Sequence, residues 1–204
     1  MRKLSMVLGT LLLAACSLGP VQKDAPATYD LGAPRSEVVN QPRIRASLLV
    51  HAVAAPAWLD TTAIIYRLNY QDAARQQAYA NSRWAAAPAA LLTQRLRGRL
   101  AAASDGGVIV AGESARADYT LRVELEDFSQ VFDAAEASRA VVMARASIVN
   151  VAKRTLLAQK SFSIARSAAS ANAEGGVRAL AAAGDEMIEA VAVWAAASLA
   201  QEKK

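Results

Sequence analysis

One segment of this chain alternates apolar and polar residues without a break, and it constrains the fold more than any other feature. Residues 119–125 read Tyr-Thr-Leu-Arg-Val-Glu-Leu, which has the two-residue period of a β-strand. One face of such a strand is buried and the other is solvated, as in many antiparallel sheets. The alternation slips at residues 126–128, which predicts a β-bulge. Residues 139–152 and 156–164 are expected to complete a three-stranded meander, with a turn at Lys153 and Arg154.

Shorter segments elsewhere are also expected to form strands. Residues 44–53 are nearly continuously apolar at their centre, and residues 64–68 combine isoleucine with an aromatic side chain. Residues 75–84 are expected to return as the hairpin partner of residues 64–68, although their alanine and glutamine content favours a helix. Residues 29–32 and 108–110 are two further candidates.

Two segments carry the period of amphipathic helices. Pro88 suits the first position of a helix that runs to about residue 103. A second helix is expected from about residue 174 to about residue 200, and its charged residues exclude a membrane span. The order of strands, helix, strands and helix predicts an α+β domain. Its antiparallel or mixed β-sheet would have about six strands, with two main α-helices covering one face.

The N-terminal residues have the organisation of an export signal. Arg2 and Lys3 precede an apolar run that is too short to cross a bilayer, and small residues follow it. Residues 13–16 read Leu-Ala-Ala-Cys and resemble a bacterial lipobox, which implies lipidation of Cys16, as by palmitate. Ser17 after that cysteine resembles an outer-membrane sorting signal. We therefore expect a signal peptide over residues 1–15, a lipidated cysteine and flexible tether over residues 16–28, and one domain over residues 29–204.

The composition excludes several classes of function. The net charge of +5 is mildly basic, without the clustered basic face that nucleic-acid binding needs. Cys16 is the only cysteine, so its acylation removes disulfides, thiol nucleophiles and thiolate metal sites. His51 is the only histidine, and the carboxylates show no acid–base spacing. The sequence therefore predicts no enzyme activity, no cofactor and no metal site.

A few residues are candidates for contact with a partner. Tyr66, Arg67 and Arg83 belong to the residue types enriched at interfaces, and Trp84 lies beside them. The same residues also suit cross-strand pairs and aromatic packing inside the domain. The arginines of the first helix leave two interpretations open, a contact with lipid phosphates and a solvated helix face. They are Arg95, Arg97 and Arg99.

Several short motifs follow the lipobox in a characteristic order. They are residues 29–32 (Tyr-Asp-Leu-Gly), 55–60 (Ala-Pro-Ala-Trp-Leu-Asp), 65–67 (Ile-Tyr-Arg) and 82–85 (Ser-Arg-Trp-Ala), the last directly before the first predicted helix. In this order and spacing, the chain resembles the ABC-type transport auxiliary lipoproteins, the PqiC-like family. The resemblance extends from about residue 29 to the final helix.

The resemblance implies a non-enzymatic auxiliary component of an intermembrane lipid transport system. Its expected partners are an MCE (mammalian cell entry) domain periplasmic protein and the ABC transporter of that protein. The lipoprotein is expected at the periplasmic face of the outer membrane of a Gram-negative bacterium, where a homo-oligomer would receive the MCE assembly. Phospholipid is a candidate ligand. A second interpretation stays open, an envelope structural or assembly lipoprotein that binds peptidoglycan or an outer-membrane protein.

Overall fold

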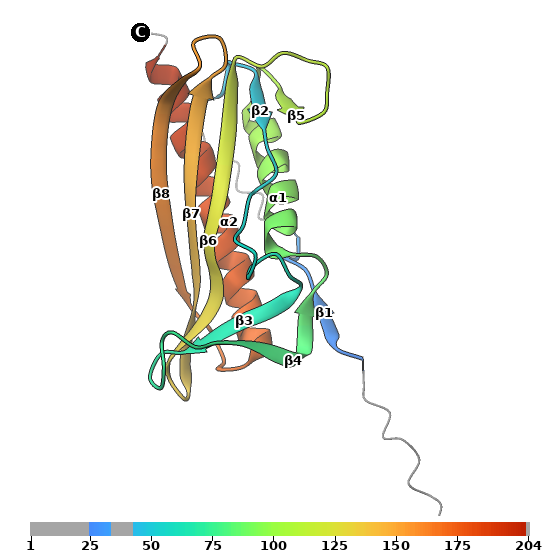
Figure 1. Ribbon diagram of the computed structural model, residues 1–204, viewed down its shortest axis with the longest axis vertical. Helices are drawn as coiled ribbons and strands as arrows, with labels where there is room; N and C mark the ends of the chain where they lie inside the picture. Colours follow the sequence, from blue (N-terminus) through green and yellow to red (C-terminus); the bar gives the residue numbers. More distant parts are fainter. Residues whose placement is uncertain (1–24, 34–42, 203–204) are drawn as a thin grey trace, which may run out of the picture.

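A computed structural model describes residues 25–33 and 43–202, which form a mixed β-sheet with two helices on one face (Figure 1). The sheet has eight strands in this part of the chain, rather than the predicted six or so. The α+β prediction is confirmed. The elements, in order, are β1 (Ala27–Tyr29), β2 (Leu48–Val50), β3 (Ala63–Leu68), β4 (Gln76–Trp84), α1 (Pro88–Ala103), β5 (Val108–Val110), β6 (Tyr119–Ala134), β7 (Ala137–Asn150), β8 (Thr155–Ser167) and α2 (Ala173–Gln201).

The predicted meander forms the larger part of the sheet. β6, β7 and β8 pair antiparallel along nearly their whole length. The register shifts between Leu125 and Asp127, so Glu126 is the extra residue of the predicted bulge. Alternate residues of β7, from Ala140 to Ile148, are buried against the helices. The other face is solvated, and Arg145 pairs there with Glu124 and Glu126.

The second edge of β6 is shared by two other strands. β2 pairs parallel with the start of β6, and β3 pairs parallel with its end. β4 returns antiparallel to β3, as the sequence predicts, and β1 pairs parallel with β4. β5 extends the other end by pairing parallel with β2. The sheet is therefore mixed, and its long central strand joins two smaller groups.

Two helices cover one face of this sheet. α2 lies across β6, β7 and β8, and α1 packs beside α2 (Figure 1). The Asn172 side chain caps α2 by accepting a hydrogen bond from the Gly175 amide. Leu92, Leu96 and Leu100 of α1 are fully buried, as expected for one face of an amphipathic helix. This layer of aliphatic side chains between helices and sheet is the hydrophobic core.

Two short strands differ from the predicted segments. The first strand is Ala27–Tyr29 rather than residues 29–32, so residues 27 and 28 belong to the sheet and not to the tether. Asp30 accepts a hydrogen bond from the Gly32 amide, and Gly32 has a φ of +69°, so the chain turns away there. β2 covers only three residues of the predicted segment 44–53. Past its end, the Val53 amide donates to the Thr93 hydroxyl of α1 instead of to a strand.

Candidate interaction surface

β1 is the first element of the described chain and follows the segment that is predicted to carry the lipid anchor. Cys16 and the N-terminal part of the predicted tether lie outside the described residues, so the structure leaves the lipidation prediction untested. β1 lies at one end of the molecule, and the β7–β8 turn lies at the other (Figure 1). Within the described part of the chain, neither helix is long and apolar enough to span a membrane.

Tyr66 belongs to an aromatic cluster inside the domain. Its ring centroid lies 4.6 Å from that of Tyr79 and 5.8 Å from that of Phe132. The Tyr79 hydroxyl donates to Oε1 of Gln130, which is fully buried. Burial, which disfavours the phenolate, and to a lesser extent the nearby Tyr66 together raise the pKa of Tyr79 to about 12. These contacts support the intradomain interpretation of Tyr66.

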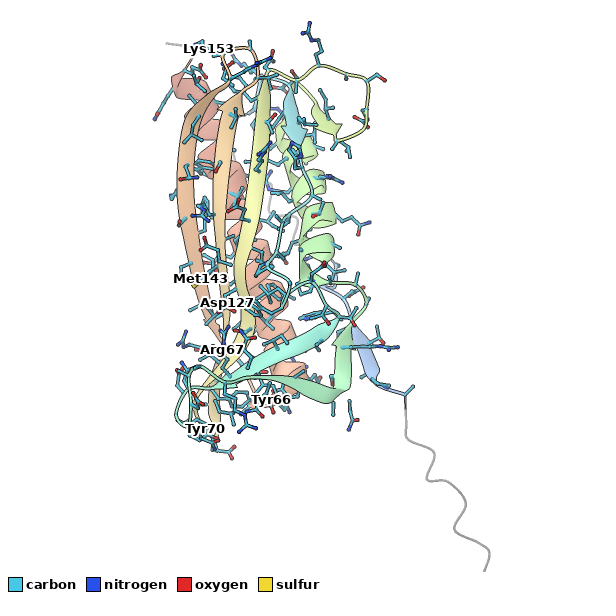
Figure 2. All side chains as sticks on the ribbon, in the orientation of Figure 1. Tyr66, Arg67, Tyr70, Asp127, Met143 and Lys153 are labelled. Carbon is cyan, nitrogen blue, oxygen red and sulfur yellow. The ribbon has the colours of Figure 1, made fainter. Side chains whose placement is uncertain are left out.

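Arg67 points to the opposite side of β3 and is also engaged within the domain (Figure 2). Its Nη1 lies 2.6 Å from Oδ2 of Asp127 and 3.1 Å from the Ser129 hydroxyl. The guanidinium lies over the Trp58 ring, 5.3 Å from the centroid. The two charged side chains are 16% and 14% exposed. Arg67 therefore ties β3 to β6 and has little surface left for a partner.

Arg83 and Trp84 are neighbours with opposite environments. Trp84 is 1% exposed and packs against Phe128 with ring centroids 5.6 Å apart. Such burial is incompatible with direct partner contact in this fold, so the prediction for Trp84 is corrected to a core role. Arg83 is exposed, and its Nε donates to the Thr28 hydroxyl of β1. Of the four predicted contact residues, only Arg83 is largely exposed to solvent.

The arginines of α1 connect elements rather than facing solvent or lipid. Arg95 pairs with Asp185 of α2 at 2.5 Å, and Arg99 binds the Glu189 carboxylate through two nitrogens. Arg97 donates to the Val50 carbonyl at the end of β2. Hydrogen bonding with Glu189 raises the pKa of Arg99. Both predicted interpretations of these arginines, a lipid-phosphate patch and a solvated face, are therefore wrong.

Gly175 and Gly176, in the first turn of α2, have a packing role. A β-carbon on Gly175 would lie 2.2 Å from the Ser170 carbonyl oxygen, and one on Gly176 would lie 2.0 Å from Oε1 of Gln130. Only a residue without a side chain fits at either position without displacing its neighbours. In residues 25–33 and 43–202, His, Cys, Asp and Glu form no group that could hold a metal ion.

A groove of about 680 Å³ lies between residues 28–33 and the first half of α2. Val177, Ala181 and Ala182 line its helix side. Three charged residues also line it. Arg178 pairs with Glu174 and Asp185 with Arg95, while the Asp30 carboxylate accepts a hydrogen bond from the Gly32 amide. The groove therefore combines small apolar side chains with charged residues at its edges.

Sequence reasoning missed the exposed apolar side chains. In the described residues, five large ones are exposed: Tyr70, Met143, Val151, Leu156 and Val193. Val151 is the first residue of the turn between β7 and β8, and Leu156 is the second residue of β8, with Lys153 and Arg154 between them. The signal was present in the sequence as an apolar residue on each side of the Lys-Arg pair, but only the fold shows that neither side chain is covered. Figure 2 shows Lys153 at this turn and Tyr70 at the other end of the molecule.

Comparison with known proteins identifies one family. A family model described as the ABC-type transport auxiliary lipoprotein component matches residues 29–192. No curated protein matches the chain significantly.

Solved structures share the fold at low sequence identity. A Xanthomonas campestris protein of the family DUF330 has a TM-score of 0.71 and 17% identity, and the match covers 88% of this chain and 95% of that one. A second, uncharacterised protein has a TM-score of 0.63 and 19% sequence identity, and that match covers 82% of this chain and 97% of the other. The Chlamydia trachomatis hypothetical protein CT253 has a TM-score of 0.52 and 8% sequence identity, and that match covers 76% of this chain and 98% of the other.

Proposed function

Because the chain belongs to the family of ABC-type transport auxiliary lipoprotein components, we propose that it is a non-enzymatic component of an MCE/ABC intermembrane lipid transport system. It acts at the periplasmic face of the outer membrane, where its domain binds the MCE-domain protein. The observation that supports this proposal most strongly is the family match over residues 29–192, behind a lipobox that ends at Cys16.

The proposal divides the chain into three parts. Residues 1–15 are a cleaved signal peptide, and Cys16 carries the lipid anchor. The tether continues to the start of β1 at Ala27, and the α+β domain follows. Each buried methylene of an acyl chain contributes about 0.8 kcal/mol, and more than one chain is needed for stable anchoring.

Anchoring would assist transport by raising local concentration. At about 3.6 Å per residue, the chain between Cys16 and Ala27 reaches at most about 40 Å. The domain is thereby confined to a thin layer beside the membrane, which raises its effective concentration for a partner without adding any contact. In this mechanism the domain aligns the transport partner with the membrane and performs no chemistry.

The proposal keeps one of the predicted contact residues. Arg83 is exposed and lies next to Thr28 of β1, close to where the tether enters. It is therefore a candidate partner contact at the anchored end of the domain. Arg83→Glu is expected to weaken partner recovery while leaving the fold intact, because the side chain makes one weak hydrogen bond within the domain.

The test is affinity purification of the full tagged chain from its native cell in mild detergent. Proteins and lipids that co-purify are identified by mass spectrometry. Recovery of an MCE-domain protein and its ABC transporter supports the proposal, and stoichiometric phospholipid adds direct lipid binding. Recovery of peptidoglycan fragments or an outer-membrane protein without an MCE protein would refute it. Cys16→Ala is the matched control, which should stay folded, lose palmitate labelling and leave the membrane fraction.

A further inference from the structure

The β7–β8 turn combines exposed apolar and basic side chains in one small area. Leu156 is 57% exposed and Val151 is 44% exposed. Single exposed apolar residues are ordinary on protein surfaces, but Val151 begins the four-residue turn 151–154 and Leu156 lies two residues after its end. Lys153 and Arg154 occupy that turn and are also exposed. We call residues 151–156 the distal tip.

The distal tip carries a net positive charge. Nζ of Lys153 lies 3.2 Å from Oε1 of Glu202, so these two charges compensate each other. A hydrogen bond from Tyr119 keeps the pKa of the Glu202 carboxyl below its ordinary value, so it is ionised at neutral pH. The positive charge of Arg154 comes in addition to this pair, so the tip is net positive.

Arg154 also occupies an unusual backbone conformation. Its φ is +54°, and it is the one non-glycine residue of the described chain with a positive φ. Glycine and asparagine adopt this conformation more readily than arginine. The turn would therefore form more easily with glycine at this position, and the arginine side chain adds nothing that the turn itself requires.

The fold holds this tip away from the anchored end. β6 rises about 36 Å between Tyr119, at the level of the tip, and Gln130, where β3 pairs with it. The tether of at most about 40 Å enters at β1, towards the opposite end (Figure 1). The tip could reach the anchoring membrane only if the tether were drawn out along the domain. That arrangement would lose most of the conformational entropy of the tether.

We infer that the distal tip is a docking surface for an acidic protein surface with an apolar patch, presented by the transport partner from the periplasmic side. This inference rests on the proposed function, which supplies the partner and the anchor. Leu156 and Val151 would supply the apolar contact, and Arg154 the charge complementarity. The long β7–β8 pairing holds the tip in one conformation. Binding a partner would therefore cost little conformational entropy at the tip.

The experiment is photo-cross-linking in cells that express the full-length chain. A photoreactive amino acid replaces Leu156 in one variant, Arg83 in a second and Tyr70 in a third. Tyr70 is the matched control, because it is 45% exposed but lies at the β3–β4 turn (Figure 2). Adducts are identified by mass spectrometry, and co-purification of the partner with the unmodified chain is measured in parallel.

Adducts from position 156 to the MCE-domain protein, and none from position 70, are the expected result. Arg154→Gly should reduce that cross-link about tenfold, while the melting temperature stays equal or rises. A turn with a purely structural role would show the higher melting temperature without the lost cross-link.

Other outcomes overturn the inference in distinguishable ways. If the MCE protein co-purifies but forms adducts only from position 83 or 70, the tip is not the docking surface and the proposed function stands. Adducts from position 156 to lipid would show that the tip meets a membrane, which also overturns the inference. If no transport component co-purifies, the proposed function fails and the inference fails with it.

Discussion

The substitution Gly176→Ala tests how α2 is seated on the sheet. A β-carbon at this position would lie 2.0 Å from Oε1 and 2.5 Å from Cδ of Gln130. Gln130 is fully buried and cannot move away without loss. It accepts a hydrogen bond from the Tyr79 hydroxyl and donates to the Ser138 hydroxyl and the Asn172 carbonyl. One methyl group therefore disturbs a network that joins β4, β6, β7 and the start of α2.

The size of the effect follows from three contributions. Forcing an additional carbon into a packed site costs about 1–3 kcal/mol. Leaving buried polar groups without partners costs about 1–3 kcal/mol more. Alanine favours the helix over glycine by about 1 kcal/mol, which offsets part of this loss. We expect the free energy of unfolding to fall by about 1–5 kcal/mol, which at the middle of that range lowers the melting temperature by about 10 °C.

Thermal and denaturant unfolding of the two purified chains, followed by circular dichroism, measure this change. Gly98→Ala in α1 is the matched control, since a β-carbon there meets nothing within 4 Å. It should stabilise the protein by about 0.5–1 kcal/mol through helix propensity alone. Replacing glycine by alanine is thus expected to raise the free energy of unfolding at position 98 and to lower it at position 176. A Gly176→Ala protein as stable as the wild type, or more stable, would refute the argument.

Three further predictions concern the core, the helix pair and pH. Trp84→Ala should lower the free energy of unfolding by about 3–5 kcal/mol in denaturant titrations, and an effect below 1 kcal/mol would contradict its burial. Arg95→Ala should lower it by about 1–3 kcal/mol, because Asp185 loses its partner, whereas the exposed Arg178→Ala should change it by less than about 0.5 kcal/mol. For Tyr79, the unfolded chain ionises first, so stability should hold below pH 10 and fall as pH rises towards about 12. Tyr79→Phe should flatten that fall in unfolding measured across this range.

The meander and both helices were predictable because their signals are local. Residues 119–125 alternate strictly, and the slip after Leu125 marks the bulge that the structure has at Glu126. Pro88 begins α1, as its preference for the first helical position indicates. The strand β4 was also predicted, against the helix preference of its alanine and glutamine residues, since pairing with β3 outweighs local propensity.

The short parallel strands were less predictable. β1, β2 and β5 have three residues each, and each lies beside a strand far away in the sequence. No local period marks such a pairing, because its position depends on the long strand β6 and on the turn that ends each segment. For this reason the local pattern places the first strand two residues late and predicts a longer β2 than the structure has.

The candidate contact residues show the same difference between what depends on local sequence and what depends on long-range contacts. The sequence by itself determined the residue types, the Leu-Ala-Ala-Cys motif and the periodicities, which depend only on neighbours along the chain. Tertiary structure alone decided that Trp84 is buried and that Arg67 is paired with Asp127. It also left the apolar side chains of the distal tip exposed. Burial and ion pairing depend on segments far apart in the sequence, and only the folded chain brings those segments together.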